Sequence, residues 1–301
     1  GSVLSEDDMR KVITTLLNDA QRKVYEKSFE VDFAVNIEDL GRFRGSIFNQ
    51  NGLPGAVFRY IKSDVKSFEA LSLPTKVLSK ISLEKRGMIL VTGATGSGKS
   101  TTIASMIEYI SQNIPYHIIT LEDPIEFTFK DKKSVIEQRE LGIDTPSYLE
   151  ALKHVMYQSP DVIFIGNIRD QDTMSAAMNA AETGQLVLST IHSINTTQTI
   201  ERIVNFYPPY QHQEVRIQLS LLLKGVISQR LVPVAGGKGR IPACEVMMLT
   251  PTIAALIREG KTNELVSYIE DGKLFGMETF DQCLARLCLE KKIAVEEAKK
   301  F

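Results

Sequence analysis

The sequence predicts an α/β protein with a small N-terminal α+β part and a larger part built on a parallel sheet. A chain of 301 residues is longer than most single compact domains, which favours two domains. The first part shows period-two alternation and a hairpin turn, which are typical of an antiparallel sheet. From Thr75 onward strands alternate with helices, the pattern of a parallel sheet covered by helices.

The composition is that of an ordinary globular protein. Apolar residues make up 43% of the chain and charged residues 24%, which argues against extended disorder and coiled-coil rods. The formal net charge is −2, so the basic footprint of a dedicated nucleic-acid binder is missing. No apolar run reaches the roughly 18 residues of a membrane-spanning helix, and the first residues lack a secretory signal pattern. We therefore expect neither a nucleic-acid partner nor an integral membrane segment.

The three cysteines, Cys244, Cys283 and Cys288, never form a C-x-x-C pair. Their number and spacing support neither a disulfide framework nor a four-cysteine zinc site, and they favour a reducing compartment. Cys283 and Cys288 share a segment whose apolar residues follow helical spacing, so we expect them to pack in a buried helix.

Within the N-terminal part we expect a helix followed by three strands. Ser5 with the acidic residues after it is typical of a helix start, and apolar residues up to Leu17 follow at helical spacing. Residues 29–35 and 42–48 alternate between apolar and polar side chains. Asn51-Gly52 is a strong hairpin signal, and residues 56–61 form the returning strand.

These patterns divide the chain into three segments. We expect the N-terminal domain at residues 1–62, a linker of mixed polarity at 63–75, and the larger domain at 76–301. Gly1-Ser2 resembles a cleavage scar left by recombinant expression, and no initiating Met is present. We therefore expect the natural chain to begin upstream and the first domain to be partial.

In the larger domain, short apolar runs predict buried strands. These runs are residues 88–91, 117–121, 162–165 and 186–191. Ile103 and Ile107 mark the core face of the helix after the first run. After Pro233 we expect mostly helix, ending in an amphipathic pair that runs to Phe301.

The segment Gly93–Ser100 matches the phosphate-binding pattern G-x-x-x-x-G-K-[ST] between a predicted strand and a predicted helix. Glycines let backbone N–H groups turn toward phosphate oxygens at the positive end of the helix. Lys99 adds a cation, and Ser100 supplies a hydroxyl for Mg²⁺. ATP or ADP with Mg²⁺ is therefore the expected ligand. The candidate nucleotide-binding residues are Gly93, Thr95, Gly96, Ser97, Gly98, Lys99, Ser100 and Thr101.

Three carboxylates follow the predicted strand 117–121. Glu122, Asp123 and Glu126 should emerge at the carboxyl edge of the sheet, where enzymes with such a loop place water-activating and metal-supporting groups. A solvated acidic turn is the alternative.

Two more candidates follow later strands. Residues 160–170 resemble a Walker B strand, but Asn167 stands where a carboxylate is expected, and an amide cannot accept a proton. His192 follows the strand 186–191, from where it can sense a γ phosphate; a structural histidine is the alternative.

Together these segments resemble the type IV pilus retraction ATPases, the PilT family of the secretion-ATPase superfamily, over nearly the whole chain. Besides the phosphate loop, the matching motifs are the Asp box at 118–127, the degenerate Walker B at 166–170, the following stretch at 180–186, the His box at 190–193, the motif associated with retraction at 251–261 and a further signature at 276–282.

The resemblance implies a RecA-like P-loop motor domain preceded by a PAS-like domain. It implies a homohexameric cytoplasmic ATPase, peripheral to the inner membrane at the pilus base, that powers pilus retraction and twitching motility. The implied partners are an inner-membrane pilus platform protein and paralogous pilus ATPases.

The resemblance also implies roles for individual residues. Lys99 and Ser100 hold phosphate and Mg²⁺. Glu122 and Asp123 are metal candidates from their place after the strand 117–121, not from the resemblance. Glu126 activates the attacking water, and His192 senses the γ phosphate.

Arginines of the N-terminal domain reach a neighbouring subunit's nucleotide in this family. Arg44 and Arg59 lie on adjacent predicted strands and are the candidates here, with Arg42 as a weaker one. Solvated strand charges are the alternative.

The chain lacks the four-cysteine zinc insertion of the extension ATPases, which favours the retraction type. A related type II or type IV secretion-system ATPase is the first alternative. A nucleotide-sensing accessory subunit with little hydrolysis is the second. A RecA-like nucleic-acid translocase is disfavoured by the near-neutral charge.

Asn167 departs from the family, whose members usually carry glutamate at this position. Loss of one charged member of a catalytic set costs a few kcal/mol of transition-state stabilisation, or about a hundredfold in rate. We therefore expect this chain to bind ATP and assemble but to hydrolyse ATP slowly.

Asn167→Glu is expected to raise steady-state ATP turnover by about a hundredfold, because it restores the missing carboxylate. Phosphate release at saturating ATP measures the effect. Asn167→Gln, which adds length without charge, is the matched control. Unchanged turnover in Asn167→Glu would refute the expectation.

Overall fold

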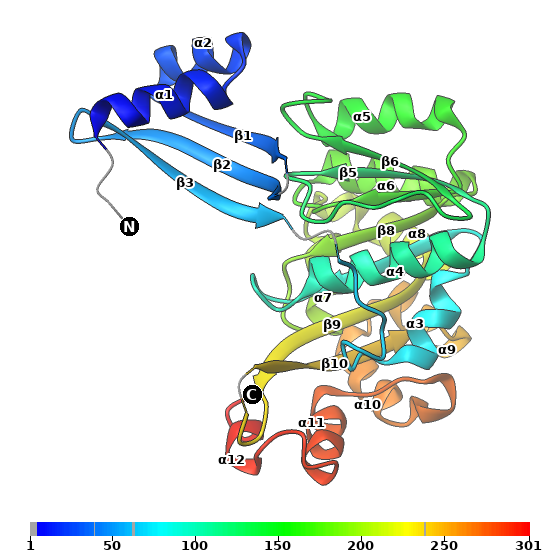
Figure 1. The fold of residues 1–301 in the computed structure, drawn as a ribbon. Coiled ribbons are helices and arrows are strands. Elements are labelled where there is room, and N and C mark those ends of the chain that lie inside the picture. The colour runs from blue at the N-terminus through cyan, green and yellow to red at the C-terminus, as the bar shows by residue number, and fades with distance from the viewer. Residues whose placement is uncertain (1–4, 39, 62–63, 238) are drawn as a thin grey trace. The chain divides into compact units, whose positions relative to one another are not determined.

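The computed structural model describes residues 5–38, 40–61, 64–237 and 239–301 (Figure 1). The chain divides into two compact units: Gly1–Asp64 with Glu126–Thr128, and Val65–Ile125 with Phe129–Phe301. Gly1-Ser2 and residues 62–63 of the region around the expected linker lie outside the described residues.

The first unit carries two helices and a three-stranded antiparallel sheet of order β1-β2-β3. Its elements are α1 (Glu6–Leu16), α2 (Asp19–Ser28), β1 (Glu30–Ile37), β2 (Gly41–Gln50) and β3 (Leu53–Ile61). The three expected strands and the turn at Asn51-Gly52 are present, with φ of 50° and 78° at these two residues. The expectation of one helix was incomplete, because Asn18 accepts a hydrogen bond from the Gln21 amide and so starts a second helix.

The core of the first unit lies between the helices and one face of the sheet. Leu17, Val31, Phe33 and Ile47 are its buried members. Gly45 makes room for the Phe33 ring, since a Cβ at Gly45 would lie 2.4 Å from Phe33 Cζ.

The second unit is built on a seven-stranded sheet of order β10-β9-β4-β8-β7-β5-β6. Its strands are β4 (Gly87–Thr92), β5 (His117–Glu122), β6 (Val135–Glu140), β7 (Val162–Ile165), β8 (Leu186–Ile191), β9 (Leu223–Pro233) and β10 (Arg240–Met248). All neighbouring pairs are parallel except β9 and β10, which are antiparallel. The predicted α/β class with a parallel sheet is thus confirmed.

Three strands of this sheet, β6, β9 and β10, were not anticipated from the sequence. The expectation of mostly helix after Pro233 was wrong for residues 240–248, because β10 pairs along its whole length with β9. Both β6 and β10 are edge strands, so β6 keeps polar side chains and β10 tolerates Pro242.

Helices cover both faces of this sheet (Figure 1). They are α3 (Thr75–Ser82), α4 (Lys99–Asn113), α5 (Tyr148–Val155), α6 (Gln171–Thr183), α7 (Thr196–Val204), α8 (His212–Leu222), α9 (Pro251–Glu259), α10 (Leu265–Glu270), α11 (Phe280–Leu289) and α12 (Val295–Ala298). None of the helices in the described ranges is long and apolar enough to cross a lipid bilayer.

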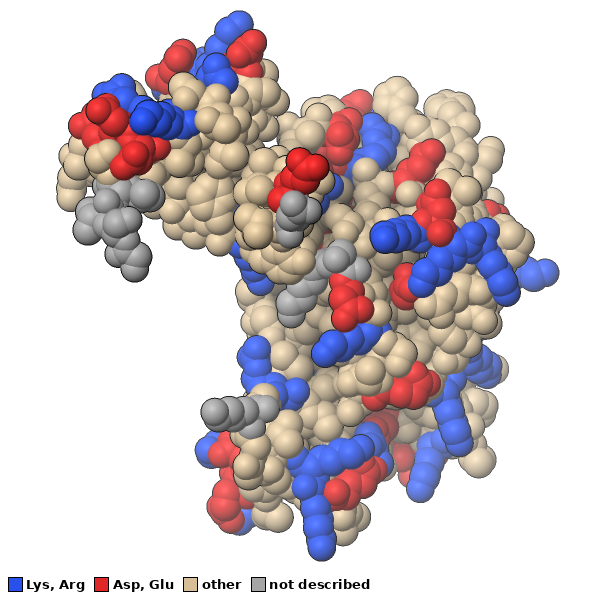
Figure 2. Space-filling model, in the orientation of Figure 1, with Lys and Arg blue, Asp and Glu red and all other residues tan. Residues whose placement is uncertain are grey.

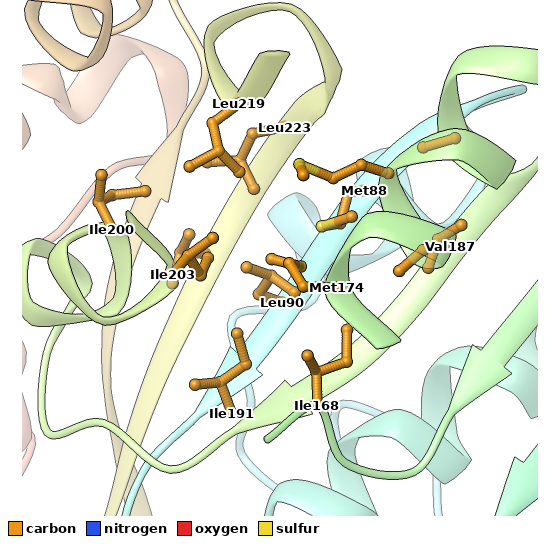
Figure 3. Packing of buried hydrophobic residues seen from close by; sticks show 14 of the residues in the cluster. Met88, Leu90, Ile168, Met174, Val187, Ile191, Ile200, Ile203, Leu219 and Leu223 are labelled. Atoms are coloured by element: carbon orange, nitrogen blue, oxygen red, sulfur yellow. The ribbon is translucent and has the colours of Figure 1, made fainter. Parts of the chain in front are cut away.

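The alternation of β4 side chains shows why both faces are buried. Met88 and Leu90 pack into one core cluster with residues of α6, α7 and α8 (Figure 3). Ile89 and Val91 point the other way into a cluster with residues of α3 and α4. A strand buried on both faces fixes where its carboxyl end, and the loop after it, must lie.

The cysteines belong to a third cluster and to the edge of the second. Cys283 and Cys288 lie on α11 as expected, with Cys283 buried and Cys288 half-buried. The backbone amide of Cys244 donates to Cys283 Sγ at 3.3 Å. Burial raises the pKa of both buried thiols, Cys283 to about 11, which keeps them protonated and unreactive.

The charged surface agrees with the near-neutral composition. On the face of the second unit in Figure 2, acidic and basic side chains are interspersed. Many of them form short-range pairs, such as Arg286 with Glu278.

Gly45→Ala is expected to destabilise the protein by about 1–3 kcal/mol, because the added methyl group overlaps the buried Phe33 ring. Equilibrium denaturant unfolding measures the loss. Gly55→Ala on the same sheet is the matched control, since its nearest neighbour, Phe48 Cε2, lies 3.2 Å away on a half-buried side chain. Equal losses in the two variants would contradict this packing account.

Candidate active site

The phosphate loop joins β4 to α4 through backbone conformations that favour glycine. Gly98 has φ of 93° and caps α4 without any side-chain hydrogen bond, which leaves the first amides of the helix to face an anion. Gly93 has φ of 147°, and a Cβ there would lie 2.4 Å from the backbone oxygen of Gln229. Only glycine fits at Gly93.

The Lys99 side chain folds back onto the start of this loop. Its Nζ donates to the backbone oxygens of Gly93 and Ala94, both at 3.0 Å, although the side chain is only 8% exposed. The loop carbonyls therefore hold a buried ammonium where a phosphate would be bound.

The remaining loop candidates divide into exposed and buried groups. Thr95 and Gly96 are exposed, Ser100 and Thr101 are half-buried on the first turn of α4, and Ser97 is buried. Among the described residues Ser97 Oγ has no hydrogen-bond partner.

Gln229 of β9 is a site residue that the sequence analysis missed. Its Oε1 accepts from Thr102 Oγ1 at 2.8 Å, and its Nε2 would lie 2.8 Å from a Cβ at Gly98. This buried amide thus contacts both the end of the loop and the first turn of α4. Only the pairing of β4 with β9 brings it there, so no local sequence signal reveals it.

A pocket of about 310 Å³ adjoins the phosphate loop. Besides residues 93–97, its lining is Ile194, Gln229, Arg230, Leu231, Arg240 and Phe301. Arg230 is fixed by two contacts: Nη1 donates to the Phe301 backbone oxygen at 2.6 Å, and the guanidinium lies 4.1 Å from the centre of the Phe280 ring.

The carboxylates after β5 lie in different environments. Glu122 is buried, and its Oε1 accepts from Thr120 Oγ1 at 2.7 Å and from Gln138 Nε2 at 3.1 Å, so it is not part of a solvated turn. Asp123 is exposed. Glu126 is exposed and belongs to the first unit, so its approach to the phosphate loop stays a prediction.

Asn167 lies in the turn after β7, next to the end of β5. It is 8% exposed, and its Oδ1 has no hydrogen-bond partner among the described residues. The Gly166 amide donates to the Leu121 oxygen at 2.8 Å, which holds the turn against β5. Farther along the motif, Asp170 caps α6 by accepting from the Thr173 amide, which is a structural role.

His192 lies in the electrostatic field of the phosphate loop. Burial lowers the pKa of its imidazole below the usual 6.5, and the positive charges of Lys99 and Arg169 lower it further. The imidazole is therefore neutral at pH 7, able to donate or accept a hydrogen bond without adding charge.

Arg44 and Arg59 lie in the first unit, directly opposite each other on β2 and β3. Asp32 pairs with Arg44 at 3.4 Å, whereas Arg59 is exposed and has no ion-pair partner among the described residues. Like charges in direct register are unfavourable, so the pair is suited to an anion. Arg42 lies two residues before Arg44 on the same strand.

The comparisons with known proteins agree on one family. Residues 54–274 match the model described as type II/IV secretion system protein. The chain is 43% identical over 297 residues to the twitching motility protein of Neisseria gonorrhoeae, covering 99% of this chain and 79% of that one. It is 43% identical over 296 residues to the type IV pilus retraction ATPase PilT of Pseudomonas aeruginosa, covering 98% and 86%. A crystal structure of the pilus retraction motor PilT with bound ADP is similar with a TM-score of 0.91 and 45% identity, covering 98% and 83%.

His192 is expected to make the protein less stable as the pH falls below about 6.5. Because its pKa is lower in the folded chain than in the unfolded chain, the unfolded chain takes up a proton first, and the free energy of unfolding decreases. Denaturant unfolding between about pH 7.5 and pH 5 measures this slope.

In His192→Gln the free energy of unfolding should change less with pH than in the wild type. His154→Gln, at an exposed position of α5, is the control and should leave this pH dependence unchanged. A slope that is equal in the wild type and in His192→Gln would contradict the assignment.

Proposed function

This chain belongs to the type II/IV secretion system protein family, and we propose that it is a pilus-retraction motor that hydrolyses ATP to ADP and phosphate. The observation that carries the proposal is the phosphate loop, in which a buried lysine, a glycine-capped helix and glycines at positive φ are all in place. The bound ADP of the similar PilT structure supports a nucleotide as the ligand.

The loop and the adjoining pocket suit the two ends of a nucleotide. The amides at the start of α4 and the ammonium of Lys99 match the phosphates in charge. The pocket offers Leu231 and Phe301 as apolar surfaces for the base, and Arg230 and Arg240 as donors.

The oxygen donors of the candidate metal-binding residues fit Mg²⁺. Hard oxygen ligands are available from the Ser100 hydroxyl, from the carboxylates of Glu122 and Asp123, and from the unpartnered Oδ1 of Asn167. In the described part of the chain no three His, Cys, Asp or Glu side chains cluster as a metal site, which suits a cation that takes its other ligands from phosphates and water. When bound, Mg²⁺ neutralises charge on the phosphates.

Two residues are proposed to act on the attacking water and on the γ phosphate. Glu126 is the proposed base for the attacking water, since Asn167 cannot take up a proton. His192 is the proposed sensor of the γ phosphate, as a neutral imidazole, since a charged imidazolium would be disfavoured beside Lys99.

We place the complete site between subunits of a homohexamer. Arg44 and Arg59, which repel each other in register, would be stabilised by the phosphates of a neighbouring subunit's nucleotide. Arginines supplied in trans stabilise the charge that develops during phosphoryl transfer. Force would then pass to an inner-membrane platform protein at the pilus base, from a position on the cytoplasmic side.

Mixed oligomers test the arginine assignment. Lys99→Ala should abolish ATP binding, and Arg44→Ala/Arg59→Ala should lower turnover by about a hundredfold or more while ATP binding is kept. When the two inactive variants are mixed, intact sites form wherever the first variant's arginines meet the second variant's loop. ATPase activity should therefore return on mixing.

The control for subunit exchange is a second mixture, in which Lys99→Ala is combined with Arg22→Ala/Lys23→Ala. These two substitutions lie on α2, outside the proposed site. If exchange occurs and the two inactive variants stay inactive together, the arginines do not act between subunits.

A further inference from the structure

A row of buried polar side chains crosses the sheet at the end of β4, directly before the phosphate loop. Thr92 is the last residue of β4, Ser228 of β9 pairs with it, and Glu245 of β10 pairs with Ser228. Residues in direct register share a face of the sheet, so the three side chains lie on one face. The hydroxyl oxygens of Thr92 and Ser228 are 2.7 Å apart. The row therefore places polar groups in the core one residue before Gly93.

Helix α7 meets this row with two buried threonines, Thr196 and Thr199, which share a face of the helix because they are three residues apart. The amide and the hydroxyl of Thr196 both donate to Glu245 Oε1, at 2.8 Å and 2.7 Å. Thr199 Oγ1 lies 3.4 Å from Thr92 Oγ1 and donates to the Asn195 oxygen at 2.7 Å. These contacts fix where the start of α7 lies on the sheet.

Thr199 also contacts the segment that carries His192. This segment joins β8 to α7, and its next residue, Ser193, is buried with its hydroxyl 2.6 Å from Thr199 Oγ1. One hydroxyl oxygen of α7 thus contacts both the last residue of the strand that leads into the phosphate loop and the residue after His192.

Core packing alone does not account for these polar groups. Leu90, two residues before Thr92 on the same face of β4, belongs to the main apolar cluster with Ile200 and Ile203 of α7 (Figure 3). Apolar side chains therefore already hold α7 on the sheet. Buried hydroxyl and carboxylate groups cost free energy unless they are hydrogen-bonded, and a satisfied network restricts the elements that it joins to one arrangement.

We propose that Thr199 is a positioning residue that ties the segment carrying His192 to the end of β4, so that the imidazole is held in place for the γ phosphate. The inference rests on the proposed function and deepens it. Thr199 is fully buried, so it acts through His192 and not on the nucleotide. With this tie in place the site distinguishes ATP from ADP, whereas without it both nucleotides are bound by the phosphate loop alone.

Thr199→Val removes the hydroxyl and keeps the branched shape of the side chain. We expect the affinity for a non-hydrolysable ATP analogue with Mg²⁺ to fall about fivefold, as for the loss of one hydrogen bond. The dissociation constant for ADP should stay within about twofold, because ADP has no γ phosphate. Thr199→Ser keeps the hydroxyl and should bind both nucleotides within about twofold of the wild type. Titration calorimetry measures all of these constants.

Thr262→Val is the matched control. The hydroxyl of the buried Thr262 donates to Glu201 Oε1 at 2.5 Å, so it also anchors α7, but away from the polar row. This variant should leave both dissociation constants within about twofold of the wild type. Equal losses of analogue affinity in Thr199→Val and Thr262→Val would show that only the general anchoring of α7 matters, and would overturn the role of Thr199.

A double-mutant cycle gives a readout that a merely structural role would not move. In the His192→Gln background, Thr199→Val should change the analogue affinity by less than about twofold, because its effect passes through the imidazole. Losses that multiply in the double variant would overturn the proposal. If Thr199→Val does not fold, Ser193→Ala removes the other partner of the 2.6 Å hydrogen bond and carries the same expectations.

The failure of this inference is distinguishable from that of the proposed function. ATP hydrolysis by the wild type, with equal weakening of ADP and analogue in Thr199→Val, would overturn the role of Thr199 and leave the proposed function intact. Bound ADP with no ATP hydrolysis in either the wild type or Asn167→Glu would instead overturn the proposed function, and this inference with it.

Discussion

The structure depends most on the close packing of the phosphate loop against β9 at Gln229. Gly93 admits the Gln229 backbone, Gly98 admits its side-chain amide, and Thr102 ties that amide to α4. A Cβ at Gly93 would overlap the Gln229 backbone and one at Gly98 its side-chain amide, so both glycines let the loop lie close against β9. This packing fixes where Lys99 and the first amides of α4 lie relative to the loop.

Electrostatics around this loop follow from burial. Lys99 is a buried cation held by carbonyl oxygens, and its charge helps to keep His192 neutral. Glu122 is a buried carboxylate that accepts hydrogen bonds from Thr120 and Gln138. Asn167 adds no charge, and its Oδ1, like Ser97 Oγ in the phosphate loop, has no hydrogen-bond partner among the described residues. By the family resemblance, the same turn is where we expect this chain to differ, with Asn167 in place of a glutamate.

Local sequence predicted what local physics determines. The strands β4, β5, β7 and β8 are buried on both faces and therefore appear as apolar runs, and the phosphate loop needs glycines at fixed spacing. The edge strand β6 has mostly polar side chains, and β10 contains Pro242 and Glu245 within its apolar run; both were missed, as was β9. Gln229 was missed for another reason: strand pairing brings it to the phosphate loop from a distant position in the chain, and it belongs to no motif. The roles of Glu126, Arg44 and Arg59 rest on family resemblance.

The central claim is that one ATP is enclosed by the phosphate loop of one subunit and the arginines of another. A high-resolution structure of the assembled protein with Mg²⁺ and a non-hydrolysable ATP analogue tests it most directly. The account predicts β and γ phosphates beside Lys99, with Glu126 and His192 facing the γ phosphate and Arg44 or Arg59 of a neighbouring subunit in contact with it. Phosphates bound in the loop while the arginines of every subunit face solvent would contradict the account.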